Sequence, residues 1–317
     1  MKAILMASAA VIALAATADA RELTLGLQDN EATPVYKGAK EFADKLAEVS
    51  AGELTVNLFP SATLGDFKAM VQQTQAGELD IVITGYPDMS YTIPELKLIG
   101  APYVISDYAQ LKEVVAGPWG QEMAGKFEEQ GIHVLDVWYY GTRQTTANKP
   151  INAIEDMKGL RLRTPNVPFL IAYAEAVGAT PAPVAFPEVY LALQTNQVDA
   201  QENPLTTIDA QKFYEVQSSV AMTSHFVASS AVLVGKQTWD GLSDQEKEWV
   251  TTAIAAGGKL NDELLQTGEA ELVTAFEEKG LTITHPDLEP FKAAMQPYYD
   301  ELEQEFGEGA IAAVTAK

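Results

Sequence analysis

The stretch S-D-Q-E-K-E-W-V-T-T-A-I-A-A-G-G-K-L-N-D-E-L-L-Q-T-G-E-A-E-L-V-T-A-F-E-E-K, residues 243–279, decides the fold. Its apolar residues recur at helical spacing, and Ser243 with Glu246 has the pattern of a capping box at its start. An unbroken helix of this length would measure about 50 Å, which is too long for one small lobe. The stretch therefore predicts a strut that connects two lobes, with its glycines marking bends.

Strand and helix patterns alternate in the first part of the chain. Strand patterns cover residues 23–28, 54–59 and 79–84, and helical patterns over residues 36–48 and 66–76 separate them. Such alternation is typical of an α/β domain, in which ligands bind at the carboxyl ends of the strands. A second strand-and-helix block follows, so the sequence predicts two α/β lobes joined by the long helix.

The first twenty residues have the pattern of a secretory signal. Lys2 supplies a positive start, residues 3–16 form an apolar core, and Ala18-Asp19-Ala20 is a small-residue cleavage motif. The apolar run is short for a membrane span, and no later stretch approaches about 18 uninterrupted apolar residues. We therefore expect cleavage after Ala20 and a periplasmic protein without direct membrane insertion.

The chain is strongly acidic and contains no cysteine. It carries 44 Asp and Glu against 21 Lys and Arg, a formal net charge of -23 at pH 7. This charge argues against nucleic acid and anionic lipid as partners, since both are polyanions. The absence of cysteine excludes disulfides, thiol nucleophiles and thiolate metal sites.

Signatures of catalysis are scarce. The sequence has no G-x-S-x-G, H-E-x-x-H or P-loop motif, and its histidines, His133, His225 and His285, are far apart in the chain. A carboxylate pair of the glycosidase kind stays open as an alternative, because acidic residues are abundant. The sequence thus favours a binding protein over an enzyme, with no metal and no cofactor.

The arginines are concentrated in one region. Only four of the 21 basic residues are arginine, and three of these, Arg143, Arg161 and Arg163, lie within a short segment. Arg161 and Arg163 alternate with leucines, so one interpretation is a strand whose arginines face solvent. The other interpretation is a ligand site, because a guanidinium binds a carboxylate through two parallel hydrogen bonds. An anionic ligand needs such a local positive site in a protein this acidic.

Motifs along the chain resemble those of one family. They are F-P-S-A-T-L-G-D (59–66), P-Y-V-I-S-D-Y (102–108), Y-G-T-R-Q-T-T-A-N-K-P-I (140–151), L-R-L-R-T-P-N (160–166), P-V-A-F-P-E-V-Y-L-A-L-Q-T-N (183–196), D-A-Q-E-N-P-L (199–205) and T-H-P-D-L-E-P-F-K (284–292). Together they resemble the substrate-binding proteins of TRAP transporters, tripartite systems that import organic acids through bacterial inner membranes. The resemblance is closest from residue 141 to residue 223, to the branch that includes sialic-acid and sugar-acid receptors.

The resemblance implies an α/β fold with the two-lobed periplasmic-binding-protein (Venus-flytrap) architecture, a ligand between the lobes and a long helix spanning both. On this pattern residues 21–140 and 229–268 form lobe 1, and residues 141–228 and 269–317 form lobe 2. The family also implies the small and large membrane subunits of a TRAP transporter as partners, and a monomeric receptor. A ligand sensor for a signalling receptor would share these residues and stays as the alternative, as does a periplasmic enzyme acting on sugar acids.

The resemblance also implies roles for individual residues. The arginine matching Arg163 pairs with the ligand carboxylate, the one matching Arg143 supports it, and the asparagine matching Asn203 hydrogen-bonds the same group. The aromatic matching Phe186 packs on the ligand, and the histidine matching His225 lies near the pocket.

Structural alternatives stay open for three of these residues. Arg143 has Glu202 as a candidate ion-pair partner, Phe186 fits a core residue, and His225 fits an ordinary hydrogen-bonded side chain.

The first lobe departs from the sialic-acid receptors. These receptors place charged and polar groups after the L-G-D turn and after the third strand, where this chain has Phe67, Gly85 and Asp88. An aromatic ring and a glycine cannot make those contacts, so the sequence argues against sialic acid. The ligand that it favours is a hydroxylated monocarboxylate, such as a uronate, an aldonate or a smaller hydroxy acid. The remaining residues predicted for the pocket are Gln28, Trp138, Tyr140 and Asn166.

Overall fold

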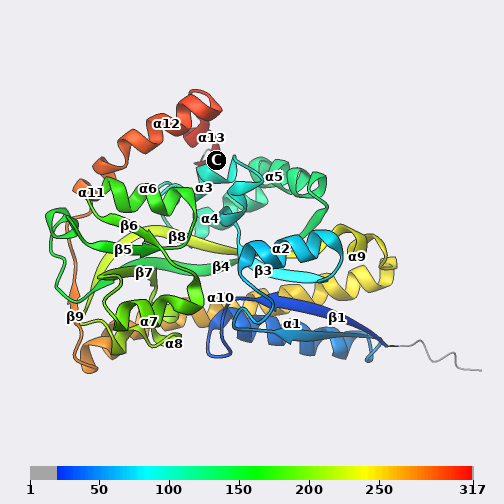
Figure 1. Cartoon of the computed structure of the whole chain (residues 1–317). Helices are drawn as coiled ribbons and strands as arrows, with labels where there is room; N and C mark the ends of the chain where they lie inside the picture. The colour runs from blue at the N-terminus through cyan, green and yellow to red at the C-terminus, as the bar shows by residue number, and fades with distance from the viewer. Residues whose placement is uncertain (1–19, 316–317) are drawn as a thin grey trace, which may run out of the picture.

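A nine-stranded sheet passes through the computed structural model, which describes residues 20–315 (Figure 1). The signal peptide predicted for residues 1–20 therefore lies, except for Ala20, outside the described residues. The strands are β1 (Arg21–Leu27), β2 (Leu54–Phe59), β3 (Ile81–Gly85), β4 (Ile132–Ala147), β5 (Arg161–Thr164), β6 (Thr180–Pro183), β7 (Ala200–Pro204), β8 (Ser219–Gly235) and β9 (Thr282–Thr284).

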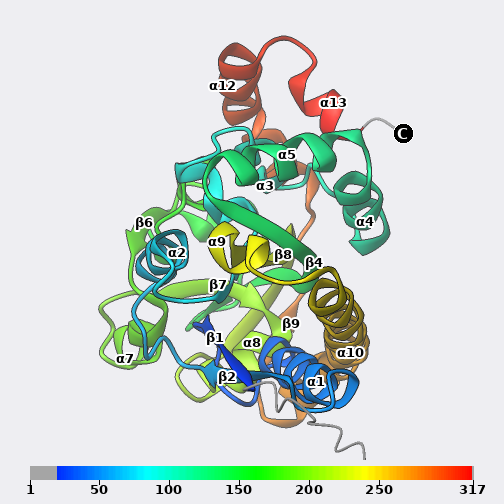
Figure 2. The ribbon, with the colours of Figure 1, turned by 90° about the vertical axis from the view of Figure 1, so that its right-hand side faces the viewer.

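Helices cover both faces of this sheet (Figures 1 and 2). They are α1 (Pro34–Val49), α2 (Phe67–Ala76), α3 (Leu96–Gly100), α4 (Tyr108–Ala116), α5 (Pro118–Glu129), α6 (Pro168–Ala176), α7 (Val189–Gln194), α8 (Leu205–Ala210), α9 (Lys236–Asp240), α10 (Asp244–Glu278), α11 (Glu289–Ala294), α12 (Gln296–Phe306) and α13 (Ala310–Thr315). None of the helices within residues 20–315 combines the length and the apolar character that crossing a membrane requires.

The strand order divides the sheet into two halves. The order is β2-β1-β3-β8-β4-β7-β5-β6, and β9 pairs with β8. The pairs β1–β2 and β1–β3 are parallel in one half, and β5–β6 and β5–β7 are parallel in the other. The halves meet at the antiparallel pair of β4 and β8. In parallel sheets, ligand-binding residues lie at the carboxyl ends of the strands. In both halves we therefore expect such residues near the junction of the halves.

β4 and β8 are long enough to belong to both lobes. β3 pairs with Ser230–Val234 of β8, whereas β7 pairs with Arg143–Ala147 of β4. Between these two regions the β4–β8 ladder shifts register at Tyr139 and Gly141, and Gly141 adopts a left-handed φ of 111°. Glycine accepts this backbone conformation without the strain that a side chain would cause. The bulge falls at the proposed lobe boundary after Tyr140.

The predicted strut is helix α10, which has 35 residues. Ser243 caps its first turn and Glu246 completes the capping box, as the sequence predicts. The helix packs along α1 in lobe 1 and continues to α8 and β9 in lobe 2. It runs without interruption through its glycines, which serve close packing: a Cβ on Gly257 would lie 2.5 Å from the carbonyl oxygen of Gly38 in α1. Glycine therefore brings the two helix backbones together here.

The C-terminal helices pack across the predicted lobe boundary. α12 and α13 lie beside α3, α4 and α5 (Figure 2), and their buried Leu302 and Val314 share a core with Leu98 and Leu111. Tyr298 and Tyr299 of α12 pack against this core and also against the core around Phe291, so the segment contacts both lobes, whereas the sequence assigns residues 269–317 to lobe 2. The assignment follows chain order, whereas burial of apolar side chains decides where a terminal helix docks.

Candidate functional site

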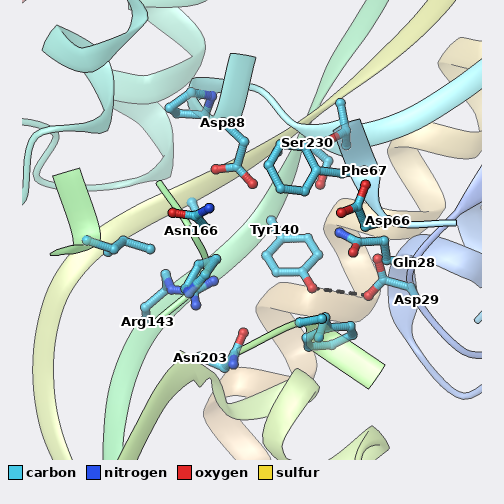
Figure 3. Close-up of a pocket in the computed structure, with 18 of the residues that line it drawn as sticks. Gln28, Asp29, Asp66, Phe67, Asp88, Tyr140, Arg143, Asn166, Asn203 and Ser230 are labelled. Carbon is cyan, nitrogen blue, oxygen red and sulfur yellow. Dashed lines mark hydrogen bonds between the residues drawn. The ribbon is translucent and has the colours of Figure 1, made fainter. Parts of the chain in front are cut away.

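A cleft of about 290 Å³ lies where the two halves of the sheet meet. Its walls come from both lobes and bring together nine of the eleven residues that the sequence predicts for the site (Figure 3). These nine are Gln28, Phe67, Asp88, Tyr140, Arg143, Arg163, Asn166, Phe186 and Asn203. The volume suits a small organic molecule.

Arg163 lies in the lobe 2 wall, on β5. Its side chain is almost fully buried, 2% exposed, and the neighbouring residue Leu162 packs in the core. Nε and Nη2 donate to the backbone oxygen of Val184 at 3.0 and 2.7 Å, and the ring of Phe186 lies 6.0 Å from the guanidinium carbon. No Asp or Glu of the described residues forms an ion pair with Arg163. Burial accordingly lowers the pKa of Arg163 to about 10.

Arg143, on β4, is bound to an acidic partner. It donates from Nε and Nη2 to the carboxylate of Glu202, which is fully buried on β7. Burial alone would raise the pKa of Glu202, but Arg143 outweighs it and, with His225, lowers that pKa to about 2. The ion pair predicted as the structural alternative for Arg143 is thus present, and Arg143 still lines the cleft. The two arginines of the cleft thus differ. Glu202 balances the charge of Arg143, whereas no acidic residue within residues 20–315 pairs with Arg163.

Two predicted pocket residues do not line the cleft. His225 is fully buried behind Glu202, with Nε2 3.0 Å from the Glu202 carboxylate, and its ring stacks on Tyr173 at 4.1 Å. Trp138 is 1% exposed and packs in the lobe 1 core, where its indole N–H donates to Asp136 at 2.9 Å. His225 therefore orients the acid that holds Arg143, and Trp138 stabilises the packing of α1 on α10.

The other ion pair of the arginine segment lies on the surface. Arg161 pairs with Asp199 at 2.6 Å, and both side chains are partly exposed. The solvent-facing interpretation is therefore right for Arg161 and wrong for Arg163, which lies in the same strand.

The lobe 1 wall contains acidic side chains that the sequence does not fully predict. Asp29 follows β1 and accepts a hydrogen bond from the Tyr140 hydroxyl at 3.1 Å (Figure 3), and burial raises the pKa of Asp29 to about 6. Asp66 caps α2 and also lines the cleft beside Phe67. Burial likewise raises the pKa of Asp88 to about 6. Asp29 comes at the carboxyl end of a strand next to Gln28, and this position is the signal that could have identified it.

Small hydroxylated side chains complete the lining. Thr84 is the next-to-last residue of β3, while Ser229 and Ser230 lie on β8 at the crossing of the lobes. The sequence does not predict any of the three. Among residues 20–315, no group of three His, Asp or Glu side chains is arranged to hold a metal ion.

The fold and the cleft define a two-lobed solute-binding protein. Residues 25–305 match the model of the family described as bacterial extracellular solute-binding protein, family 7, and the chain belongs to this family of TRAP periplasmic receptors. Such proteins are receptors rather than enzymes.

Three relatives are similar over most of their length. The chain is 43% identical to the sialic acid-binding periplasmic protein SiaP of Vibrio cholerae serotype O1, over 100% of both chains. It is 31% identical to the 2,3-diketo-L-gulonate-binding periplasmic protein YiaO of Escherichia coli K12, over 87% of this chain and 85% of that one. A TRAP periplasmic solute-binding protein from Polaromonas sp. JS666, solved with bound D-erythronate, superposes with a TM-score of 0.88 at 29% identity, covering 93% of this chain and 98% of that one.

Proposed function

We propose that this receptor captures a hydroxylated monocarboxylate, and that Arg163 binds the carboxylate. The supporting observation is the buried guanidinium of Arg163, which has no acidic partner among residues 20–315 and faces the cleft. An unpaired buried charge is costly, and a bound carboxylate would remove that cost while forming two charge-assisted hydrogen bonds. Arg143 and Asn203 border the same wall and would support the carboxylate.

The rest of the cleft suits a hydroxylated carbon chain. The rings of Phe67, Tyr140 and Phe186 offer apolar faces, and Gln28 and Asn166 offer hydrogen bonds to hydroxyl groups. The ligands named for the three relatives, sialic acid, 2,3-diketo-L-gulonate and D-erythronate, are all oxygen-rich carboxylic acids. Uronates, aldonates and smaller hydroxy acids share this chemistry. Sialic acid is not favoured, since Phe67 and Gly85 replace the polar groups that would meet its tail.

Capture would proceed by closure of the lobes. The ligand docks on Arg163, and lobe 1 then adds its contacts and excludes water, so the closed state is favoured because the ligand binds it more tightly. The segments that connect the lobes are β4, β8 and α10. We further propose that the monomeric receptor has its signal peptide cleaved after Ala20, delivers its ligand to the two TRAP membrane subunits, and does not chemically change it.

A thermal-shift screen tests the ligand class. Uronates, aldonates, sialic acid, dicarboxylates and 2-oxo acids would be compared, since a ligand at 100 times its Kd stabilises the folded state by about 2.7 kcal/mol. We expect hits among hydroxylated monocarboxylates, and an unchanged ligand in an NMR time course. Hits confined to neutral or cationic compounds would contradict the proposal.

The anchor is tested with variants two residues apart. Arg163→Ala should weaken binding by about 2–5 kcal/mol, and Arg163→Lys should also weaken it because the planar fork is lost. Arg161→Ala is the matched control, because Arg161 forms only a surface ion pair with Asp199. Ligand affinity in Arg163→Ala equal to that of the wild type would show that the carboxylate binds elsewhere.

A further inference from the structure

Asp88 is a carboxylate in the cleft wall without a hydrogen-bond or ion-pair partner among residues 20–315. Asp29 accepts a hydrogen bond from Tyr140 and Asp66 caps helix α2, but no residue of the described chain donates a hydrogen bond to Asp88 or pairs with it. Figure 3 shows its carboxylate pointing into the cleft, toward Asn166. A ligand could therefore bind the Asp88 carboxylate without competing with a hydrogen bond of the protein, whereas Asp29 and Asp66 already accept one.

The backbone around Asp88 makes room for this carboxylate. Asp88 lies in the short 3-10 helix Pro87–Tyr91, and the buried Met89 fixes that turn in the lobe 1 core. A Cβ atom on Gly85, at the end of β3, would lie 2.4 Å from the carboxyl carbon of Asp88. Any side chain at position 85 would thus displace the Asp88 carboxylate. Gly85 and Asp88 act as one unit that presents an acid to the cleft.

The charges that face Asp88 do not neutralise it. They are Arg143, Arg163, Glu202 and Lys68. Arg143 is already paired with Glu202, and the Lys68 ammonium lies over the Phe67 ring, 5.7 Å from its centre, rather than in the cleft wall.

Within residues 20–315, Arg163 is therefore the cleft arginine without an ion pair, and Asp88 is the cleft acid that accepts no hydrogen bond and forms no ion pair. The carboxylate of a simple hydroxy acid would balance the charge of Arg163, but its hydroxyl groups would offer Asp88 only neutral hydrogen bonds. The negative charge of Asp88 would stay without a counter-charge in the closed cleft, and such a desolvated charge is costly. A ligand that carries one carboxylate and one ammonium would satisfy both residues and add no net charge.

We propose that Asp88 binds a protonated amine of the ligand, so that the ligand is a zwitterionic hydroxylated amino acid such as an amino-sugar acid. The inference rests on the proposed function and narrows its ligand class from hydroxylated acids to those that also carry an amine. The carboxylate pairs with Arg163, the ammonium pairs with Asp88, and the rings of Phe67 and Tyr140 enclose the carbon chain between them.

Calorimetry with matched ligands tests this inference. Hydroxy acids of three to six carbons, for example D-gluconate, would be compared with counterparts in which one hydroxyl is an amine, for example 2-amino-2-deoxy-D-gluconate, and with their N-acetyl derivatives. We expect an amine-bearing acid to bind the wild type at least about tenfold more tightly than both uncharged counterparts. Asp88→Asn should weaken that ligand by about 30-fold or more, as expected for loss of a buried charge partner, and abolish the preference.

The variants separate this inference from the proposed function. Arg163→Ala should weaken amine-bearing and hydroxy acids alike, whereas Asp44→Asn, an exposed exchange on α1, should change neither. The inference alone would be overturned if the wild type bound hydroxy or N-acetyl acids more tightly than amine-bearing acids and Asp88→Asn no longer bound them. That result would show that Asp88 accepts hydrogen bonds from hydroxyl groups. Equal affinity for acids in Arg163→Ala and the wild type would overturn the proposed function instead.

Proton exchange gives a second readout that does not depend on finding the optimal ligand. Because burial raises the pKa of Asp88 to about 6, an ammonium beside it should lower that pKa and release protons on binding near pH 6. A hydroxy acid brings only negative charge and should cause proton uptake. The two signs are distinguished by measuring binding heats in buffers with different ionisation enthalpies. Proton uptake with the amine-bearing acids, or proton release that persists in Asp88→Asn, would contradict the inference.

Discussion

Arg143 and Glu202 form a buried ion pair directly behind the cleft. Nη2 of Arg143 lies 2.8 Å from one carboxylate oxygen of Glu202 and 2.7 Å from the backbone oxygen of the same residue, and Nε donates to the other carboxylate oxygen. The charge of Arg143 is thus balanced within the protein, whereas the one acceptor of Arg163 among the described residues is a neutral backbone carbonyl. The ion pair orients Arg143, and the charge of Arg163 is the one that we propose to attract the anion.

Glu202→Gln should destabilise the protein by about 3 kcal/mol, because it leaves Arg143 buried without a counter-charge. Urea unfolding at pH 7, followed by circular dichroism, measures the difference. Asp199→Asn is the matched control, since Asp199 pairs with Arg161 at the surface, and it should change the unfolding free energy little. Equal unfolding midpoints for the two variants would show that the buried ion pair contributes nothing to stability.

Asp29→Asn should stabilise the ligand-free protein above pH 6. Burial raises the pKa of Asp29 from 3.8 to about 6, so the folded state favours the protonated form. The stability that this preference supplies is complete below pH 4 and is lost as the pH rises through 6. Asparagine mimics the protonated form at every pH. The gain over the wild type should therefore be absent at pH 4, grow up to about pH 6, and reach about 1–3 kcal/mol above it.

Unfolding midpoints of Asp29→Asn and the wild type across pH 4–8 check this expectation. Asp44→Asn serves as the control, because Asp44 is exposed on α1. A gain that is the same at all pH values would mean that the effect of the substitution comes from packing and not from ionisation.

Features encoded by local sequence are those that could be predicted. The start of α10 follows from Ser243 and Glu246, which are three residues apart and bond to each other's backbone. The sequence could not decide whether the arginine strand faces solvent or a ligand site. Alternation shows that Arg161 and Arg163 lie on the same face of the strand, but it does not show which part of that face other segments cover. The motifs shared with the family, rather than the alternation, distinguished Arg163 as the arginine of this strand that lines the cleft.

Features that depend on distant segments could not be predicted. The partner of Asp29 is one of them, because the hydroxyl that donates to it belongs to Tyr140, more than a hundred residues later in the chain. The aromatic run Trp138-Tyr139-Tyr140 gives no indication of which ring faces the ligand, since the bulge at Gly141 shifts the ladder there. Trp138 consequently packs against α1 and α10, while Tyr140 lines the cleft.

Gly257→Ala should destabilise the protein by about 1–3 kcal/mol, because the new Cβ would lie 2.5 Å from the backbone oxygen of Gly38 and would push α10 away from α1. Gly125→Ala on helix α5 is the matched control, since a Cβ there meets no atom within 4 Å. The control should stabilise by about 0.4–1 kcal/mol through the unfolded state. Thermal unfolding of both variants measures the difference, and similar gains in midpoint would contradict the packing role of Gly257.

Glu269→Ala should loosen the β4 bulge where the lobes meet. Glu269, on α10, accepts hydrogen bonds from the Thr142 backbone N–H and, at 2.8 Å, from the Tyr139 hydroxyl, so the long helix holds the strand on both sides of Gly141. Loss of these bonds should speed amide hydrogen exchange across residues 139–143 and leave β1 unchanged, because local opening depends on local hydrogen bonds. Glu271→Ala, an exposed exchange two residues along α10, is the control. Unchanged exchange at Thr142 in Glu269→Ala would mean that pairing with β8 alone fixes the bulge, and α10 would then be a spacer between the lobes, not a clamp on the strand that joins them.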